Sequence, residues 1–393
     1  MKHLAPTGND RRLAFLLIVA GTVIGIAGTD LVLPAVPGMP DALGGTVSQA
    51  QFVLAAFVAG AAVGLLVFGT LGARFDQRRL LVGSLLAYAL VSGLAAMSTS
   101  LDMLIALRFL QGAAGSAAAV FAPGIIRALF GDQRAIGALG FLGSVEAMTP
   151  ALAPIAGVWL YNAYGWNSSF MVIAATALLI GCAIHLLRSR LPATIARQSA
   201  GGYRQLLRDP TFLRYALSQA FTLGALLVIV FAAPTLFVAV LGGTLTDFII
   251  MQIAGIATFA IAANITGRLA ARFGAERMIW IGTVLSAAGC LMMLVYALAG
   301  GTEPLIVAAI FVPINSGLGL RGPVCFHRAV VASRGDDARG AALVILSVLL
   351  TTGAGTALVA PFITLGLLPL ALVATALTLA AVALLLLPPL SEV

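Results

Sequence analysis

The sequence has very little charge. Only 9% of its 393 residues are Asp, Glu, Lys or Arg, whereas soluble domains contain about 25% of these residues. Hydrophobic residues make up 61% of the chain, and the mean hydropathy is +1.08. These values exclude an ordinary soluble protein and favour a chain that lies mostly within a membrane.

Cysteine and histidine are also scarce, with three of each. Cys182, Cys290 and Cys325 fall inside apolar runs without paired spacing, so we expect them to be packing residues and not disulfides or metal ligands. No Ser or Cys is accompanied by a matched His at membrane depth, and no His/Cys cluster has metal spacing. We therefore expect no enzymatic activity, no cofactor and no metal.

Long extramembrane segments are missing as well. The longest polar stretch, 188–210, is too short to form an ATPase, a kinase or a nucleic-acid-binding module. A positive net charge of +8 does not indicate nucleic-acid binding here, because the distribution of the charges explains it. All Lys and Arg residues except Arg108 and Arg321 lie in the termini or on one side of the expected spans. The positive-inside rule therefore predicts that both termini are cytoplasmic.

Apolar runs of about 20 residues fill the rest of the chain, which is the length a helix needs to cross a bilayer. The backbone must satisfy its own hydrogen bonds in lipid, and the alternating pattern of a barrel strand is absent. The sequence therefore predicts an all-α membrane protein with twelve transmembrane helices. The expected spans are 13–36, 47–71, 80–98, 103–128, 136–161, 168–187, 211–237, 247–270, 278–299, 304–327, 341–363 and 367–387.

An internal repeat divides the chain into two halves. The segment from Gly69 to Arg79, Gly-Thr-Leu-Gly-Ala-Arg-Phe-Asp-Gln-Arg-Arg, recurs in degraded form from Gly267 to Arg277. Both copies stand where one apolar run ends and the next begins. We expect an N-terminal six-helix bundle over 1–187, a cytoplasmic linker over 188–210 with a short helix near 203–208, and a C-terminal six-helix bundle over 211–393.

The first copy of this repeat resembles the loop signature of the major facilitator superfamily between its second and third spans. That resemblance implies a conformational-switch loop, which in the family clamps helix ends on the cytoplasmic side. Ala73 and Asp76 stand where the family has Asp and Gly, so Asp76 is the carboxylate left to act there. The residues assigned to this loop in the two copies are Gly69, Arg74, Asp76, Arg78, Arg79, Gly267, Arg272 and Arg277.

Three further motifs narrow the resemblance. The run from Arg108 to Gly112, Arg-Phe-Leu-Gln-Gly, is similar to the fourth-span signature of the family, and Pro150, Pro154 and Gly157 follow its antiporter motif. The segment from Thr29 to Pro37 and the phrase Phe-Ala-Ala-Pro at 231–234 resemble the drug:proton antiporter branch of the bicyclomycin and chloramphenicol resistance type. This resemblance implies two pseudo-symmetric six-helix bundles and transport by alternating access.

Ionisable residues inside the membrane are candidates for function, because each costs roughly 2.5–3.5 kcal/mol to insert. Asp30 and Arg108 both fall roughly 10 Å from the outer surface when the spans are counted at 1.5 Å per residue. We expect them to form an ion pair that protonation of Asp30 would release. The alternative is a static pair that only fixes helix packing. The resemblance implies the proton-coupling role for both residues.

Glu146 and Arg321 are two further ionisable residues inside the expected spans. Glu146 lies near the middle of its span and is expected to carry a proton or bind a cationic substrate; otherwise it is a protonated residue bonded to a neighbouring helix. Arg321 either binds an anionic substrate group or Glu146, or extends along the helix to the cytoplasmic surface. Gln111 and Asn315 are expected to hydrogen-bond to substrate, although such amides often bridge helices.

These observations together predict a proton-coupled antiporter that exports small, largely apolar compounds across the bacterial inner membrane. Its expected partners are a small-molecule substrate, protons and the lipid bilayer, and the chain is expected to be a monomer driven by the proton gradient without a cofactor. A proton symporter or facilitator that imports a small organic acid or zwitterion is the alternative. A receptor or scaffold without transport would leave the intramembrane charges unexplained.

Overall fold

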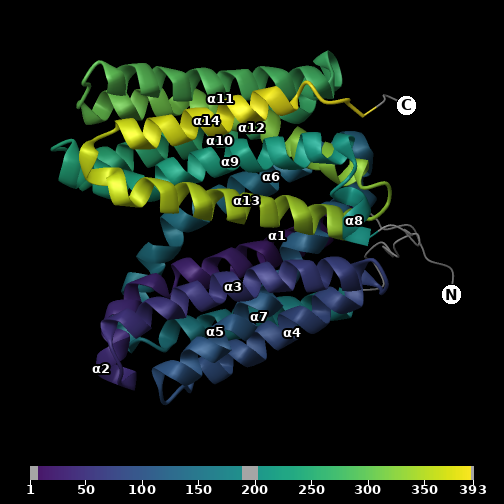
Figure 1. Cartoon of the computed structure of the whole chain (residues 1–393). Helices are drawn as coiled ribbons and strands as arrows, with labels where there is room; N and C mark the ends of the chain where they lie inside the picture. Colours follow the sequence, from purple (N-terminus) through teal and green to yellow (C-terminus); the bar gives the residue numbers. More distant parts are fainter. Residues whose placement is uncertain (1–7, 188–201, 391–393) are drawn as a thin grey trace. The chain divides into compact units, whose positions relative to one another are not determined.

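The computed structural model describes residues 8–187 and 202–390, and within these ranges every regular element is a helix. The expected all-α class is therefore confirmed. Residues 188–201 of the predicted linker lie outside the described part. The chain divides into two compact units, and Figure 1 shows the long helices that form them.

The first unit comprises Met1–Gly131, Val145–Gly202 and Gly335–Ala342. Its α1 helix is followed by a 3-10 turn at Leu33–Gly38 and by the short helix α2. The helices that build this unit are α1 (Gly8–Asp30), α2 (Met39–Leu43), α3 (Val47–Gly72), α4 (Gln77–Ala96), α5 (Leu101–Gly115), parts of α6 (Ala117–Tyr164) and α7 (Ser168–Leu187).

The second unit comprises Asp132–Ser144, Tyr203–Arg334 and Leu343–Val393. The expected short helix near 203–208 is present as α8, which begins one residue earlier and ends two residues earlier than predicted. The helices of this unit are part of α6, α8 (Gly202–Leu206), α9 (Pro210–Thr235), α10 (Leu245–Phe273), α11 (Ala275–Leu298), α12 (Pro304–Ala332), most of α13 (Asp337–Val359) and α14 (Leu368–Leu384).

The two units have the same internal pattern of helix contacts. In the first unit α3 packs on α5, α4 packs on α7 and on α5, and α1 packs on α7 and on α5. In the second unit α10 packs on α12, α11 packs on α14 and on α12, and α9 packs on α14 and on α12. Each contact in one unit has a counterpart six spans later, as the internal repeat in the sequence predicts.

Twelve spans can be counted in the described residues. Ten apolar helical stretches are long enough to cross a membrane, and one of them, Leu101–Pro150, has 50 residues and is long enough to cross twice. The shorter apolar helix Leu368–Leu384 completes the set. The break inside the double-length stretch is Gly131, whose φ of 73° and ψ of 164° interrupt α6. We expected a loop over 129–135, but one glycine with a positive φ is sufficient to turn the chain.

Side-chain caps define where several helices begin. Asp76 lies just before α4, and its side chain accepts a hydrogen bond from the backbone N–H of Arg78. The Arg78 guanidinium also pairs with the Asp76 carboxylate at 2.8 Å. Partial burial acts to raise the pKa of Asp76, but the hydrogen bonds from Arg78 and the charges of Arg78 and Arg79 outweigh it and hold this pKa below its ordinary value.

Glycine allows α3 and α5 to approach very closely. A Cβ atom at Gly112 would overlap the carbonyl oxygen of Phe57, and one at Gly60 would overlap the carbonyl oxygen of Phe109. Small residues at such positions bring two helix backbones together in lipid, where dispersion contacts replace the hydrophobic effect as the main attraction. Gly112 belongs to the Arg-Phe-Leu-Gln-Gly motif, so the motif has a packing role besides any role of its polar side chains.

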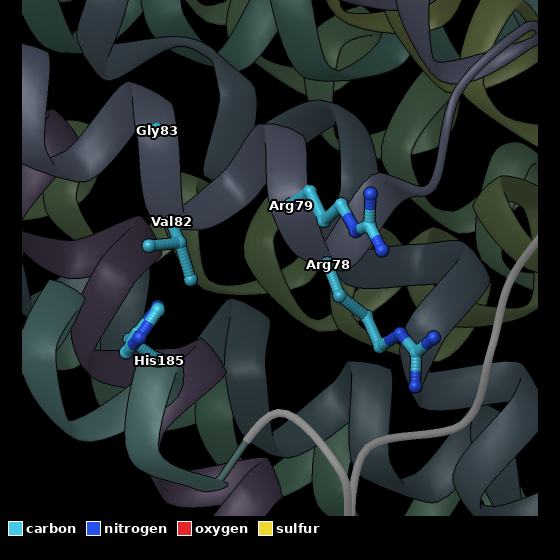
Figure 2. A pocket seen from close by; sticks show the side chains of 5 residues that line it. All are labelled: Arg78, Arg79, Val82, Gly83 and His185. Carbon is cyan, nitrogen blue, oxygen red and sulfur yellow. The ribbon is translucent and has the colours of Figure 1, made fainter.

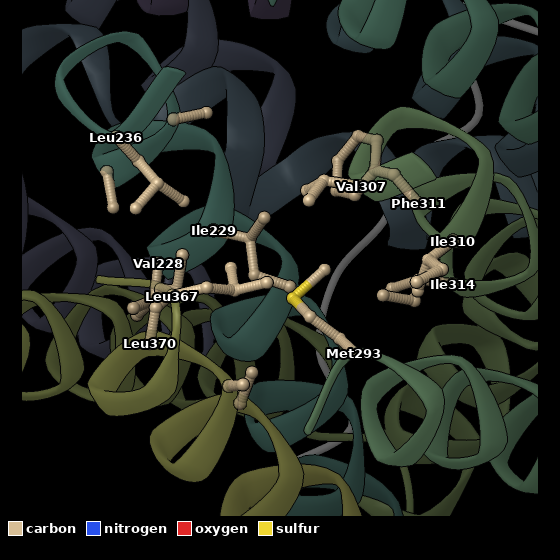
Figure 3. Packing of buried hydrophobic residues seen from close by; sticks show 14 of the residues in the cluster. Val228, Ile229, Leu236, Met293, Val307, Ile310, Phe311, Ile314, Leu367 and Leu370 are labelled. Atoms are coloured by element: carbon tan, nitrogen blue, oxygen red, sulfur yellow. The ribbon is translucent and has the colours of Figure 1, made fainter. Parts of the chain in front are cut away.

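The second unit contains a large apolar core built from α9, α11, α12 and α14. Figure 3 shows Ile229 from α9, Met293 from α11, Phe311 from α12 and Leu370 from α14 meeting in this cluster. All the buried residues of the cluster are apolar. Each large side chain buried in this way stabilises the packed state by about 1.5–3 kcal/mol in water, and packing contacts supply the corresponding term in lipid.

A polar clamp joins the chain beyond α14 to the start of α9. Arg214 donates to the carbonyl oxygen of Leu385 at 2.6 Å and pairs with Glu276 at 2.6 Å. The Tyr215 hydroxyl donates to Glu276 and accepts from the backbone N–H of Leu390. The end of α14 is therefore attached to α9 and α11 by hydrogen bonds and charge, in addition to apolar packing.

Replacing Gly112 with Val should force α3 away from α5, because the new side chain would occupy the position of the Phe57 carbonyl group. We expect a loss of about 3 kcal/mol in stability. Gly93→Ala is the matched control, since no atom lies within 4 Å of the added Cβ and alanine favours the helix by up to about 1 kcal/mol. Thermal unfolding in detergent measures both. Equal stability of the two variants would contradict the close approach.

Replacing Asp76 with Ala should destabilise the protein by about 1 kcal/mol at neutral pH through loss of the cap. Because the folded-state pKa of Asp76 is lowered, its charge-dependent contribution is present above the ordinary carboxyl pKa of about 4 and is lost as pH falls through the lowered value. The difference from wild type should therefore shrink between pH 7 and pH 3 in thermal unfolding. Asp76→Asn keeps a capping oxygen and should show less pH dependence. A gap that does not vary with pH would contradict the ion pair.

Candidate functional site

The candidate site is built around the C-terminal end of α1. This helix ends at Asp30, and a proline-containing 3-10 turn follows it at Leu33–Gly38. Proline removes backbone donors and fixes φ, so the helix cannot continue through this region. Asp30 is half-buried at this end, where the sequence predicted a charge inside the membrane.

Arg108 is fully buried in α5 and binds oxygen atoms on two neighbouring helices. Its Nε donates to the carbonyl oxygen of Val53 in α3 at 3.0 Å, and its Nη1 donates to the carbonyl oxygen of Gly28 in α1 at 3.0 Å. The guanidinium also lies 4.3 Å from the ring centre of Phe57. Hydrogen bonds from a charged group contribute about 1.5–3 kcal/mol each, and a desolvated cation–π contact adds about 2 kcal/mol.

Gln111 extends this arrangement into a chain of hydrogen bonds. Its Oε1 accepts from Arg108 Nη1 at 2.6 Å, and its Nε2 donates to the Ser92 hydroxyl at 2.7 Å. The Ser92 hydroxyl donates to the carbonyl oxygen of Tyr88, and the Tyr88 hydroxyl donates to the carbonyl oxygen of Ile24 in α1. Gln111 is fully buried, so it joins helices in this structure; its predicted contact with substrate stays a prediction.

Sequence reasoning missed Tyr88 and Ser92 as members of this network. Both are fully buried on α4 and four residues apart, so they share one face of the helix. Two hydroxyl-bearing residues at this spacing within an apolar span are a usable signal, because a buried hydroxyl needs a partner in lipid.

The expected ion pair between Asp30 and Arg108 is not formed in the described structure. Arg108 is bonded to Gly28, Val53 and Gln111 instead. Residues two positions apart on a helix point about 200° away from each other, and Gly28 faces Tyr88 and Phe57. Asp30 therefore points away from the side of α1 that meets Arg108. Counting residues gave the depth of both groups but not their direction around the helix.

The predicted antiporter motif lies against the same end of α1. A Cβ at Gly157 would overlap the carbonyl oxygen of Leu31, so α6 very closely approaches the backbone just after the end of α1. Ser169 at the start of α7 donates to that same oxygen at 2.9 Å. Pro150 and Pro154 lie inside α6 and remove two of its backbone donors. Asp30 therefore lies between two residues whose carbonyl oxygens accept hydrogen bonds from other helices. Arg108 donates to Gly28 and Ser169 donates to Leu31.

Glu146 lies in α6, half-buried, with its carboxyl near the side chain of Thr22 in α1. Thr22 lies eight residues before Asp30, which is about 12 Å along the helix axis. Two of the predicted carboxyls are therefore arranged along a single helix. Whether Glu146 carries a proton or binds substrate stays a prediction.

Arg321 in α12 is fully buried and bonded to α9. Its Nη1 donates to the carbonyl oxygen of Ser218 at 2.9 Å, and its Nη2 donates to the Ser218 hydroxyl at 2.9 Å and to Cys325 Sγ at 3.0 Å. The alternative in which Arg321 reaches the membrane surface is therefore wrong, since α9 encloses the guanidinium. Its Nε has no partner among the described residues.

Asn315 is also buried in α12, with its Nδ2 donating to the carbonyl oxygen of Phe311 at 3.0 Å. Its amide nitrogen lies beside Gly255 of α10, and the predicted role in substrate binding stays a prediction. A residue that sequence reasoning missed is Gln219 of α9, which is buried and whose Oε1 has no partner in the described part of the chain. An unpaired buried amide oxygen requires a water or ligand.

The two copies of the predicted switch loop turn the chain in different ways. In the first copy Asp76 caps α4 and pairs with Arg78, while Arg74 and Arg79 are exposed and Gly69 is buried. In the second copy Gly274 stands at the position of Asp76 and has a φ of 91°, which favours glycine. Of the other residues assigned to this copy, Arg272 and Arg277 are exposed, and Gly267 lies against Gly137 of α6.

Comparison with known proteins places this architecture in a family. The chain matches the Major Facilitator Superfamily over residues 18–341. It is 30% identical over 287 residues to a chloramphenicol resistance protein of Pseudomonas aeruginosa, covering 71% of this chain and 67% of that protein. It is 24% identical over 314 residues to a bicyclomycin resistance protein homolog of Haemophilus influenzae, covering 77% and 79% respectively.

Solved structures show the same fold. The transporter FucP in its outward conformation aligns with a TM-score of 0.74 at 18% identity, covering 96% of this chain and 98% of that one. The proton:xylose symporter XylE aligns with a TM-score of 0.72 at 13% identity, covering 93% and 94%. Because the family match spans most of the sequence and the twelve membrane spans agree with it, this chain belongs to the Major Facilitator Superfamily and is a membrane transporter, not an enzyme.

Proposed function

We propose that this transporter exports small, largely apolar compounds in exchange for protons, and that Asp30 carries the proton. The observation on which this rests is the arrangement at the end of α1. A permanently charged, fully buried Arg108 holds the Gly28 carbonyl, and a half-buried carboxyl stands two residues further on. This guanidinium has no counter-charge among its hydrogen-bond partners, so an ionised Asp30 that turned toward it would supply one.

The proposed switch has two states. In the state described here, Arg108 donates to carbonyl and amide oxygens, and its buried Nη2 has no partner among the described residues. No carboxylate is bonded to it, which suits a neutral, protonated Asp30. When Asp30 ionises, Coulomb attraction favours a direct pair with Arg108 and a rotation of the end of α1. Gly157 and Ser169 hold Leu31 from the other side, so such a rotation would be transmitted to α6 and α7. Proton binding would thereby shift the populations of two conformations.

The direction of transport and the setting of the chain are part of the same proposal. Relatives named for chloramphenicol and bicyclomycin resistance support export of compounds of that kind. The clustering of arginines on one side supports a bacterial inner-membrane location with both termini in the cytoplasm. Glu146, beside Thr22 on α1, is the proposed second carboxyl facing the substrate path, and no cofactor is required because the proton gradient supplies the energy.

Replacing Asp30 with Asn should abolish proton-driven transport while leaving exchange intact. Asparagine keeps the size and hydrogen-bonding capacity of a neutral carboxyl but cannot release a proton. In proteoliposomes with an imposed pH gradient and chloramphenicol as the probe, we expect accumulation to fall to background and counterflow to continue. Asp102→Asn, which changes an exposed carboxylate in the first turn of α5, should behave as wild type. Unchanged accumulation by the Asp30 variant would remove Asp30 from the mechanism.

A second measurement determines the direction. In energised inside-out vesicles with an acidic interior, adding chloramphenicol to an antiporter should dissipate the pH gradient, because each substrate molecule that enters is exchanged for protons that leave. A proton symporter that imports its substrate should dissipate a pH gradient only in right-side-out vesicles with an acidic exterior, because substrate and protons then enter together. A facilitator moves no protons and should leave the gradient unchanged in both orientations. Gradient loss confined to that orientation would support import and contradict the proposed export.

A further inference from the structure

A cavity of about 330 Å³ lies between α4 and α7, away from the end of α1 described above. Figure 2 shows its five lining residues, Arg78, Arg79, Val82, Gly83 and His185. The first four occupy the first two turns of α4, and His185 is in the last turn of α7. The helix ends at this cavity belong to the arginine-rich side of the chain, which the positive-inside rule makes cytoplasmic.

Helical spacing explains why these side chains meet. Arg78 and Val82, and likewise Arg79 and Gly83, are four residues apart and therefore lie on one face of α4. A Cβ added at Gly83 would have no atom within 4 Å, so the missing side chain leaves open space on this part of α4. The cavity thus depends on a glycine at one position and on arginine one turn earlier.

The charge of the cavity is positive. Arg78 is balanced by its ion pair with Asp76, whereas Arg79 is exposed and no carboxylate pairs with it among the described residues. His185 is exposed and its imidazole offers at least one N–H donor in either charge state. The cavity therefore offers the guanidinium of Arg79, the guanidinium of Arg78 that is paired with Asp76, and the imidazole of His185. Together these donors suit an anionic group with several acceptor oxygens.

Apolar side chains continue from the cavity into the membrane. One and two turns beyond Val82 on α4, Leu86 and Leu90 are exposed. One and two turns before His185 on α7, Cys182 and Leu178 are exposed as well. An occupant with a negative head and hydrocarbon tails would therefore meet a basic cavity and then an apolar strip, in the order in which a phospholipid presents them.

We propose that this cavity binds the headgroup of an anionic phospholipid of the cytoplasmic leaflet, with its phosphodiester at Arg79 and His185 and its acyl chains along Leu86 and Cys182. Basic pockets between transmembrane helices on the cytoplasmic side are suited to such headgroups. The lipid would join the first turn of α4 to the last turn of α7. It would thus connect the loop that ends at Arg79 to the helix that leads out of the first unit.

Native mass spectrometry of the purified, delipidated protein tests this proposal, with phosphatidylglycerol and phosphatidylethanolamine of identical acyl chains as probes. Wild type should retain phosphatidylglycerol in preference to phosphatidylethanolamine. Arg79→Gln should weaken retention about fivefold, since a cation at the membrane surface contributes about that factor. Gly83→Leu should reduce retention similarly by filling the cavity without changing its charge. Arg277→Gln, at the equivalent position of the second repeat, should retain the lipid as wild type does.

Size-exclusion chromatography establishes that each variant is folded before lipid is added. If Gly83→Leu does not fold, the comparison of Arg79→Gln with wild type is sufficient to test the proposal. Equal retention of the two lipids, or retention unaffected by Arg79→Gln, would overturn the proposal. A further arm adds inorganic phosphate at millimolar concentration. Displacement of phosphatidylglycerol by phosphate would show a site for the free anion and would overturn the assignment to a lipid.

Discussion

The structure depends on the requirement that a buried positive charge in a membrane must be surrounded by oxygen atoms. This requirement applies to both Arg108 and Arg321, which are fully buried. Neither has a carboxylate partner among the hydrogen bonds described. Each donates mainly to backbone and side-chain oxygens, but Nη2 of Arg108 and Nε of Arg321 have no partner in the described part of the chain. The desolvation of such an ion costs several kcal/mol, so the helices that supply these oxygens must stay close to the arginine. These helices are α1 and α3 for Arg108, and α9 for Arg321.

The two units meet this requirement in unequal ways. In the first unit a chain of hydrogen bonds runs from Arg108 through Gln111 and Ser92 to Tyr88 and returns to α1. In the second unit Arg321 is bonded to Ser218 and Cys325, and Cys325 donates to the carbonyl oxygen of Tyr215. The network of the first unit returns to α1, the helix that ends at Asp30. A polar network rearranges when a proton is added or removed, and this connection to Asp30 is why we place the proposed proton coupling in the first unit.

Much of this organisation could be predicted from the sequence, because span length, the repeat of Gly69–Arg79 and the arginine asymmetry are properties of composition and order. The depth of Asp30 and Arg108 could be predicted by counting residues, but their pairing could not. The rotation of α1 about its axis near its end is determined by close packing, as at Gly28 against Tyr88. No local sequence pattern predicts this rotation. The break of α6 at the single residue Gly131 could not be predicted either. Glycine is common throughout these helices, so one more glycine does not indicate a break.

The turn between α3 and α4 and the turn between α10 and α11 occupy matching places in the repeat, yet they are built differently. The first is held by the carboxylate of Asp76 and its arginine partner, and the second by the left-handed backbone of Gly274. A turn stabilised by an ion pair loses stability gradually as salt or acid is added. A turn that requires the positive φ of a glycine tolerates almost no substitution. Salt or acid can therefore weaken the turn between α3 and α4, whereas the turn between α10 and α11 is insensitive to both.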